Sequence, residues 1–376
     1  MTSPKARCAR YNSIVDAKSR STRREFLQGK AAADALAEAA AALPVGELPD
    51  LATDRFHLVK LSRRAMACQF EVYLNAGQHD GGTQAALAAF DLVDALEDQL
   101  SIYRDESEVS RLNRRAFALP TVVEPRLFSL LELAASIHRE TAGAYDITAG
   151  PLSSVWGFTS RAGVIPSPNE LARAMARVGS QFLVFDRDAQ SIRFLVPDME
   201  INLGSIGKGY ALDRCAELLD AAEIHNYLLH GGNSSVLARG CPAGADKAWS
   251  VGVRHPLQPD RRVGQLRLNN RALATSGSGT QFFMHEGRRY GHILDPRTGW
   301  PADQVLSATV LAPTAAQADA LSTALYVMGP AAVGEFCQTH PDMAVVMFCP
   351  GKRQGSMVRH EFGLSEGDWS EIDEPL

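Results

Sequence analysis

The sequence predicts an α+β fold, and three observations support this prediction. Some segments alternate apolar and polar side chains as half-buried strands do, and others have the 3.6-residue periodicity of amphipathic helices. These segments follow one another without the regular alternation of a doubly wound parallel sheet and without a detectable repeat. With 376 residues, of which 45% are hydrophobic, the chain is long enough to bury a large core.

The first half of the predicted body mixes both kinds of element. Residues 70–74 alternate apolar and polar side chains, which predicts a strand. Residues 85–100 place apolar side chains at helical spacing with acids between them, which predicts a helix packed on the sheet, and residues 127–141 repeat that pattern. Two apolar runs, 182–185 and 192–196, flank a short turn and predict a hairpin.

The second half continues the mixed pattern. Residues 208–222 and 315–327 have helical spacing. Strands are predicted over 227–229, which ends at a glycine pair, and over 263–268 and 307–311.

The two ends of the chain differ from this body. We expect a leader and linker over 1–54, a folded domain over 55–350 and a polar, acidic tail over 351–376 that extends into solvent. Residues 21–28 read Ser-Thr-Arg-Arg-Glu-Phe-Leu-Gln and are similar to a twin-arginine export signal, but charged residues interrupt the Ala-rich run that follows. Two interpretations stay open: export to the cell envelope or periplasm, or an amphipathic or disordered leader on a cytoplasmic protein.

Composition excludes several classes of function. The net charge is -5 and the basic residues form no stripe, so we expect no nucleic-acid partner. No stretch approaches the roughly 20 apolar residues of a membrane-spanning helix. The six cysteines form neither a Cys-x-x-Cys pair nor a Cys/His cluster with zinc spacing.

Four segments have more Gly, Ser, Thr and Asp than a plain core would use. They are residues 143–152, 202–210, 274–280 and 292–299. In the second of these, glycines connect an apolar strand to a helix and Lys208 stands at the junction, so backbone N–H groups, the helix dipole and a full charge could together hold a phosphate. The spacing matches neither a Walker A loop nor a Rossmann loop, and a Gly-rich turn with a solvent-exposed lysine is the alternative.

Oxygen-bearing side chains elsewhere indicate a site for a hard cation. Thr275, Ser276 and Gly277 offer hydroxyls and a flexible backbone suited to a pyrophosphate or ribityl chain. Asp319 and Thr323 lie four residues apart on one helix face, where both could bind Mg²⁺. The alternatives are a simple turn for the first segment, and a surface or capping acid with a core threonine for the second.

Together with Met66, residues 100–113, 156–158 and the glycine pair at 231–232, these segments resemble the ApbE family of FAD:protein FMN transferases, in order over residues 57–349. The resemblance implies a T-fold-like α+β domain of two lobes with the flavin in the cleft between them. It further implies Mg²⁺ as cofactor, FAD as substrate, and an acceptor protein with a flavinylated threonine, for example a subunit of a redox complex. Monomer and homodimer both remain open.

The resemblance also assigns cofactor-binding residues. It implies that Met66 and Tyr103 line the isoalloxazine side, with Tyr103 stacking on the ring, although a core-edge aromatic is the alternative. Asp146 would bond the ring or the adenine end. The other expected cofactor positions are Ala144, Tyr145, Asn202, Lys208, Thr275, Ser276, Gly277, His292, Ile293 and Asp295.

The resemblance implies a metal held by the Ser205 carbonyl with Asp319 and Thr323. Lys208 would neutralise the pyrophosphate, and His292 is the expected general base because an imidazole with an ordinary pKa near 6.5 suits this task. The alternative for His292 is a structural imidazole that bonds its own turn. Asp295 is expected to cap that turn or to help place the cofactor.

The chain departs from the family pattern at four places. Asn202 and Asn233 replace a common Asp, residues 278–280 replace Asp/Ser-Tyr, and residues 67–68 replace Gly-Thr, so the site has fewer acids.

Three functions would use the same residues. They are the transferase, an Mg²⁺-dependent FAD pyrophosphatase that uses water, and an FAD-binding module without chemistry. A ring stacked on Tyr103 argues against the pyrophosphatase, and the Asp319/Thr323 pair argues against simple storage.

Overall fold

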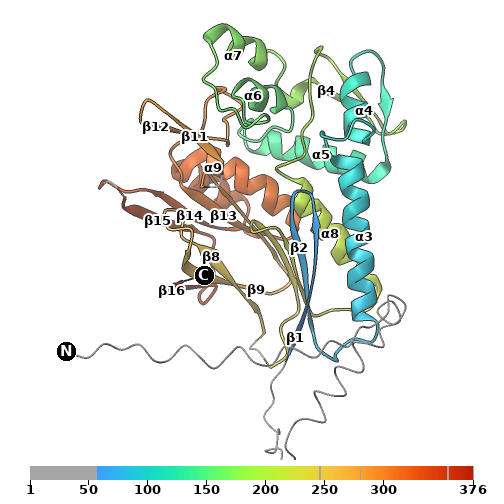
Figure 1. The fold of residues 1–376 in the computed structure, drawn as a ribbon, viewed down its shortest axis with the longest axis vertical. Coiled ribbons are helices and arrows are strands. Elements are labelled where there is room, and N and C mark those ends of the chain that lie inside the picture. Colours follow the sequence, from blue (N-terminus) through green and yellow to red (C-terminus); the bar gives the residue numbers. More distant parts are fainter. Residues whose placement is uncertain (1–56, 245–246, 280, 354, 376) are drawn as a thin grey trace, which may run out of the picture. The chain divides into compact units, whose positions relative to one another are not determined.

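An eight-stranded antiparallel sheet is the frame of the computed structural model, which describes residues 57–244, 247–279, 281–353 and 355–375 (Figure 1). The predicted leader at 1–54 lies outside the described residues. The strands, in their order across the sheet, are β1 (Leu58–Ala65), β2 (Cys68–Asn75), β6 (Tyr227–Gly231), β7 (Ser235–Arg239), β10 (Ala272–Gly277), β13 (Ser307–Ala312), β14 (Ala344–Pro350) and β15 (Met357–Phe362).

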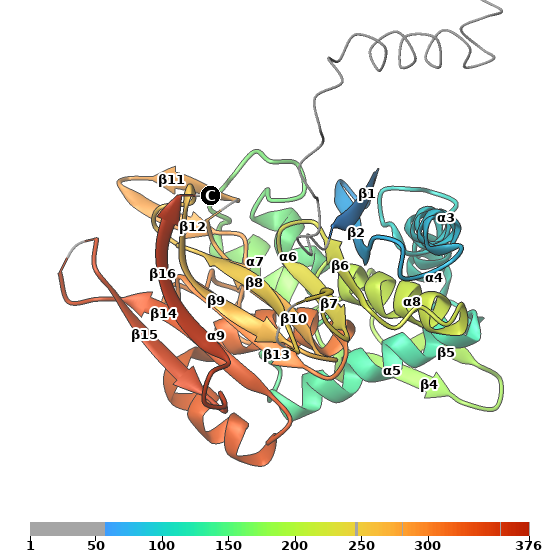
Figure 2. The same ribbon diagram turned by 90° about the horizontal axis from the view of Figure 1, so that it is seen from below.

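Both faces of this sheet are covered, so its central strands are apolar on both sides. One face packs on helices α3 (Gly82–Leu100), α8 (Gly207–Ala221) and α9 (Ala315–Thr339), which form the largest core. The other face packs on a three-stranded sheet of β16 (Trp369–Pro375), β9 (Arg261–Leu268) and β8 (Trp249–Arg254), as the view in Figure 2 shows. Within β6, Leu229 belongs to the first core and Leu228 to the second, because successive side chains in a strand point to opposite faces.

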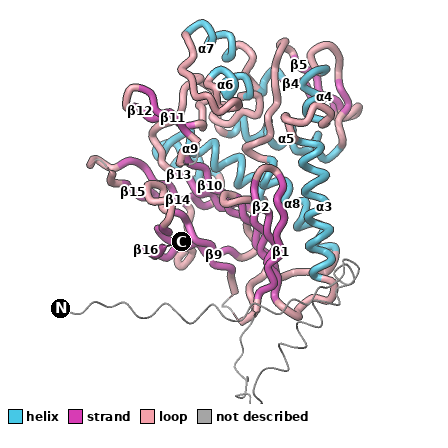
Figure 3. Tube along the Cα trace, in the orientation of Figure 1, coloured by secondary structure: helices cyan, strands magenta, loops and turns pink. Residues whose placement is uncertain are grey.

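The remaining elements form a partly helical region beside the large sheet (Figure 3). It has a third small core around Trp156, to which Leu152, Tyr290 and Leu294 contribute. Its helices are α4 (Glu108–Arg115), α5 (Pro125–Glu140), α6 (Gly150–Val155) and α7 (Pro168–Met175), and its strands are β3 (Thr121–Val122), β4 (Leu183–Asp186), β5 (Ser191–Phe194), β11 (Phe282–His285) and β12 (Arg288–Gly291).

The expected α+β class is confirmed, and the predicted helices and strands all form. The helix predicted over 315–327 continues to Thr339, with a break at Gly329, whose φ of 77° precedes Pro330.

The C-terminal segment differs from the expected solvated tail. Residues 357–362 form β15 against β14, and residues 369–375 form β16 against β9. Trp369 and Met357 pack on the second core, and Trp369 lies so close to Gly264 that a Cβ there would be 2.0 Å from its ring. Because the segment is mostly polar and acidic, its few apolar side chains did not predict these strands.

Among the described helices, α9 has the length and apolar composition of a membrane span. Its apolar side chains are already used, since the helix packs on β10, β13 and α8 and contributes to the main core. These contacts make α9 a core helix of this fold.

Candidate active site

A polar cavity of about 480 Å³ lies where the four Gly- and Ser-rich segments meet. Every residue expected at the site lines it except Met66 and Asp295. The expected residues that line the cavity are Tyr103, Ala144, Tyr145, Asp146, Asn202, Ser205, Lys208, Thr275, Ser276, Gly277, His292, Ile293, Asp319 and Thr323.

The N-terminus of α8 forms the cationic end of the cavity. The helix begins at Gly207, and its N-cap residue Ile206 supplies no side-chain cap, while Gly209 N in the first turn donates to the Asp319 carboxylate. Lys208 lies in this first turn, and its Nζ is 3.7 Å from Oδ2 of Asp319. The partial charge of the helix and the full charge of the lysine therefore act on the same space, as an anionic phosphate requires.

Asp319 joins α9 to this end of the cavity. Its Oδ1 accepts a hydrogen bond of 2.6 Å from Ser235 Oγ, and its Oδ2 accepts one of 2.8 Å from Gly209 N. A Cβ on Gly209 would lie 2.0 Å from the Ala315 carbonyl oxygen, so only glycine allows α8 to approach α9 this closely. Gly209 thus allows its N–H to bond the Asp319 carboxylate on the neighbouring helix.

Hydroxyl groups surround Asp319. Ser276 Oγ lies 3.1 Å from Thr323 Oγ1 and 2.8 Å from Ser322 Oγ. In the part of the chain that is described, no three His, Cys, Asp or Glu side chains are grouped as a metal cluster. One carboxylate with neutral oxygens fits Mg²⁺, which takes few protein ligands and completes its shell with water and phosphate oxygens, and does not fit a zinc site.

The turn over residues 143–148 forms the opposite wall. Tyr145 is fully buried, burial raises the pKa of its phenol, and its hydroxyl accepts a bond of 3.3 Å from Ser205 Oγ. Asn202 N donates to Ile147 O at 2.7 Å, while Asn202 Oδ1 accepts from Gly204 N at 2.9 Å. Asn202 therefore ties this wall to the loop before α8.

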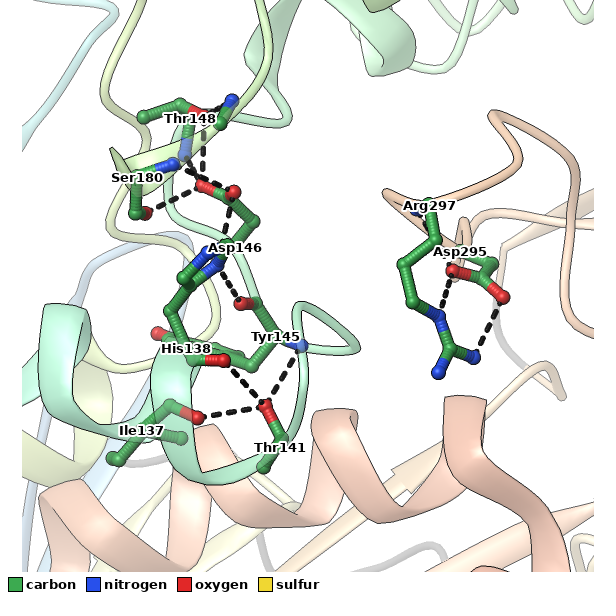
Figure 4. Close-up of polar contacts among 10 residues, drawn as sticks. Ile137, His138, Thr141, Tyr145, Asp146, Thr148, Ser180, Asp295 and Arg297 are labelled. Atoms are coloured by element: carbon green, nitrogen blue, oxygen red, sulfur yellow. Dashed lines mark hydrogen bonds and ion pairs between the residues drawn. The ribbon is translucent and has the colours of Figure 1, made fainter. Parts of the chain in front are cut away.

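The carboxylate of Asp146 is occupied by protein donors (Figure 4). It accepts from the N–H and hydroxyl of both Thr148 and Ser180, at 2.7 to 2.9 Å. Burial alone would raise the pKa of Asp146, but the bonds from His138, Thr148 and Ser180 outweigh it and hold the pKa below its ordinary value. The side chain is only 2% exposed. Its bonds hold the turn in shape, and any ligand contact here would involve the backbone.

His138, at the end of α5, is a residue of the site that the sequence did not reveal. Its Nδ1 lies 3.0 Å from Tyr145 O and 3.1 Å from Asp146 Oδ2, so one N–H supports both residues (Figure 4). The bond to Asp146 raises the pKa of His138. A lone histidine on a helix gives no sequence signal for such a contact.

Tyr103 is 74% exposed at the edge of the cavity, where its ring is available for a planar ligand. Met66 lies apart from the lining. It forms the two-residue turn between β1 and β2 with Ala67, and both have positive φ, 47° and 58°. Its N–H donates to Glu97 Oε2 at 2.7 Å.

His292 has the arrangement of a general base. Its Nδ1 lies 3.0 Å from the Gln281 carbonyl oxygen, which can only accept, so Nδ1 carries the proton and the neutral ring keeps a lone pair on Nε2. Burial lowers the pKa of His292, the bond to Gln281 opposes this, and Lys208 adds to the lowering. The ring thus bonds Gln281, outside its own turn.

Asp295 lies outside the cavity lining. Its carboxylate makes two bonds to the Arg297 guanidinium, at 2.9 and 2.8 Å (Figure 4). It also accepts from Arg297 N at 2.9 Å. These contacts are those of a turn cap rather than of a cofactor ligand.

The fold and the cavity together define a class of protein: an α+β protein whose cavity has a cationic, hydroxyl-rich end, an exposed aromatic ring and a half-buried imidazole. The family model described as the ApbE family matches residues 66–347. The chain belongs to the ApbE family.

Named relatives and solved structures agree with this. The chain is 31% identical over 284 residues to the FAD:protein FMN transferase of Haemophilus influenzae, covering 72% of this chain and 81% of the relative. It is 35% identical over 243 residues to that of Salmonella typhimurium, covering 63% and 69%. The crystal structure of the ApbE protein of Thermotoga maritima superposes with a TM-score of 0.72 at 28% identity, covering 81% and 97%. The flavin transferase ApbE of Vibrio cholerae gives 0.71 at 28% identity, covering 82% and 97%.

Proposed function

We propose that the protein is an FAD:protein FMN transferase that cleaves FAD at its pyrophosphate, attaches FMN to a threonine of an acceptor protein and releases AMP. The observation that carries this proposal is one shared cavity. It contains the Lys208–Asp319 pair at the start of α8 and a half-buried His292, whose Nδ1 bond to the Gln281 carbonyl leaves the lone pair of the neutral ring on Nε2. A storage site has no use for such a base.

The lining supports one orientation of FAD. The diphosphate belongs at the start of α8, where Lys208 and the positive end of the helix dipole offset its charge. The flavin ring belongs beside the exposed Tyr103, between this residue and the backbone of residues 144–146. Thr275 and Ser276 then face the chain that links the two.

The donor set fits Mg²⁺, and we propose that Asp319, Thr323 and the Ser205 carbonyl hold it. When bound, the ion supplies positive charge that offsets the charge on the phosphates. Ser235 and Gly209 fix the Asp319 carboxylate in one orientation before any ligand arrives. This pre-orientation lowers the cost of binding.

The reaction requires alignment and one proton transfer. The acceptor hydroxyl enters beside His292, whose Nε2 takes its proton as the oxygen attacks the phosphorus on the FMN side. A new phosphoester bond forms, the bond to the bridging oxygen breaks, and AMP departs with that oxygen. Lys208 neutralises the charge on the diphosphate while the bond breaks.

The test is an assay of the full chain with FAD, Mg²⁺ and the acceptor domain of a redox-complex subunit expressed without flavin. Mass spectrometry should locate FMN on one threonine, and chromatography should find one AMP per modified threonine. Rapid release of AMP without acceptor would identify the protein as an FAD pyrophosphatase instead. FAD bound without release of AMP under either condition would indicate storage.

A further inference from the structure

The last turn of α5 carries a histidine that pairs with a buried carboxylate of the cavity wall. The His138 side chain is 16% exposed, and its Nδ1 lies 3.1 Å from Oδ2 of Asp146 (Figure 4). The same nitrogen lies 3.0 Å from the Tyr145 carbonyl oxygen. Both partners are acceptors, so Nδ1 carries a proton in the neutral ring and in the charged ring alike. Protonation of Nε2 therefore changes the charge of this pair and leaves its hydrogen bonds in place.

The side chains that line the cavity carry more negative than positive charge. Among the described lining residues, one lysine stands against two carboxylates, which are those of Asp146 and Asp319, and His292 is neutral at neutral pH because burial lowers its pKa. Lys208 already has Asp319 as its partner, with Nζ 3.7 Å from Oδ2. The Asp146 carboxylate is removed from solvent, so its charge is weakly screened and opposes an anionic ligand. A positive charge on His138 balances it.

The groups around His138 favour its charged form. The hydrogen bond to Asp146 raises the pKa of His138 above its ordinary 6.5, burial acts against this, and the charge of Asp146 adds to the increase. Arg139, the next residue of α5, lowers the pKa by a smaller amount. On the facing side, across the glycine of the turn, Arg297 is already paired with Asp295. Asp146 is therefore the charged partner of this imidazole.

We propose that His138 acts through Asp146 as a positioning residue, and that its positive charge sets the affinity of the cavity for FAD. This inference rests on the proposed function, because that function makes an anionic dinucleotide the ligand. FAD binds more tightly to the protein with charged His138, so its affinity decreases as pH rises through the pKa of this residue. By linkage, bound FAD makes His138 hold its proton more tightly.

The experiment measures the Kd of FAD for the full chain between about pH 6.5 and 9, by flavin fluorescence without Mg²⁺ or acceptor. His138→Asn keeps a hydrogen-bond donor near the position of Nδ1 and removes the charge. The matched control is His340→Asn. His340 Nδ1 also bonds a backbone carbonyl, that of Phe336 at 2.9 Å, and its Nε2 lies 3.8 Å from a carboxylate oxygen of Glu140, but these partners lie outside the turn over 143–148.

The Kd of FAD for the wild type should rise by roughly fivefold or more from the acidic to the alkaline end of this range. His138→Asn should bind FAD at every pH as weakly as the wild type does at the alkaline end, because it lacks the charge. The control should follow the wild type. A wild-type Kd that does not change with pH refutes the proposal, as does a His138→Asn protein that keeps the wild-type pH dependence.

A measurement on the wild type covers the case in which the variant does not fold. NMR spectra of histidine ring carbons should show that bound FAD raises the midpoint of the His138 titration by about 0.7 pH unit or more, since that change corresponds to fivefold in affinity. An unchanged midpoint in the FAD complex refutes the proposal. A protein that shows this linkage but transfers no flavin to the acceptor would confirm the role of His138 and contradict the proposed function.

Discussion

At the residue scale, the protonation of His292 decides whether the site can act as a base. Its Nδ1–H is committed to the Gln281 carbonyl, and burial lowers its pKa, so the ring is neutral at neutral pH with Nε2 available. The sequence left open whether this imidazole only bonds its own turn. The actual partner comes from the segment before β11, a contact that no local pattern encodes.

Replacing His292 with Gln removes the base while leaving a polar side chain of comparable length. We expect the transfer rate to fall by about 10² to 10⁴, with FAD affinity retained, because the proposed diphosphate contacts lie at α8. The pKa of His292 lies below its ordinary 6.5, so the wild-type transfer rate should decrease with acidification only below pH 6.5. This decrease should be absent in the variant. A rate profile that the substitution leaves intact would exclude His292 as the base.

Asp319 and Asp213 both lie at the contact of α8 with α9, but only Asp319 lines the cavity. Asp319→Asn keeps the shape and loses the charge, so we expect the Mg²⁺ concentration for half-maximal transfer to rise by about tenfold or more. Titration of Mg²⁺ at saturating FAD checks this. Asp213→Asn, the matched control, should leave the Mg²⁺ dependence unchanged, and an equal shift in both variants would mean that the effect is only structural.

At the scale of elements, the pairing of α8 with α9 builds the cationic end of the cavity. Asp213 of α8 accepts from the N–H groups of Ala315 and Ala316 at 2.7 and 2.8 Å and so caps the start of α9. Gly209 allows the two helices to touch, and Lys208 and Asp319 meet as a result. The spacing of Asp319 and Thr323 predicted one shared helix face, while their meeting with Lys208 is a tertiary result.

Gly209→Ala should push α8 away from α9, because its Cβ would lie 2.0 Å from the Ala315 carbonyl oxygen. We expect a loss of roughly 1 to 3 kcal/mol or more in the free energy of unfolding, as for overpacked cores, together with weaker FAD binding. Urea unfolding measures the first and fluorescence titration the second. Gly207→Ala is the control, since its Cβ would meet nothing closer than Leu100 Cδ1 at 4.0 Å. Equal stability of the two variants would contradict this account of the helix contact.

Burial raises the pKa of Asp213 from its ordinary 3.8 to about 6, although the hydrogen bonds from the N–H groups of Ala316 and Ala315 act to lower it. The folded state therefore binds this proton more tightly than the unfolded state. The resulting stabilisation is fully present below pH 3.8 and is lost as pH rises through about 6. Two pKa units correspond to about 3 kcal/mol, so the stability of the wild type relative to Asp213→Asn should fall by up to that amount between pH 4 and 7. A pH-independent difference in urea unfolding would show that the carboxyl is not perturbed.

At the scale of the whole molecule, periodicity was sufficient for the α+β class and for the main helices and strands, because apolar spacing directly reflects which faces are buried. It was insufficient at the C-terminus, where Trp369 anchors a strand within an acidic segment. Most of the residues expected at the site line one cavity, because segments rich in glycines, hydroxyls and acids are costly in a fold without a function for them. Asp146 and Asp295 show the limit of that reasoning, since internal partners satisfy their carboxylates. His138 shows the converse, a supporting residue with no motif.

The most direct test is a crystal structure of the protein with FAD and Mn²⁺, using anomalous scattering to locate the ion. We expect an anomalous peak between Asp319 and Thr323, the diphosphate within reach of Lys208 and the flavin ring against Tyr103. A flavin bound outside this cavity, or an ion held away from those two side chains, would contradict it.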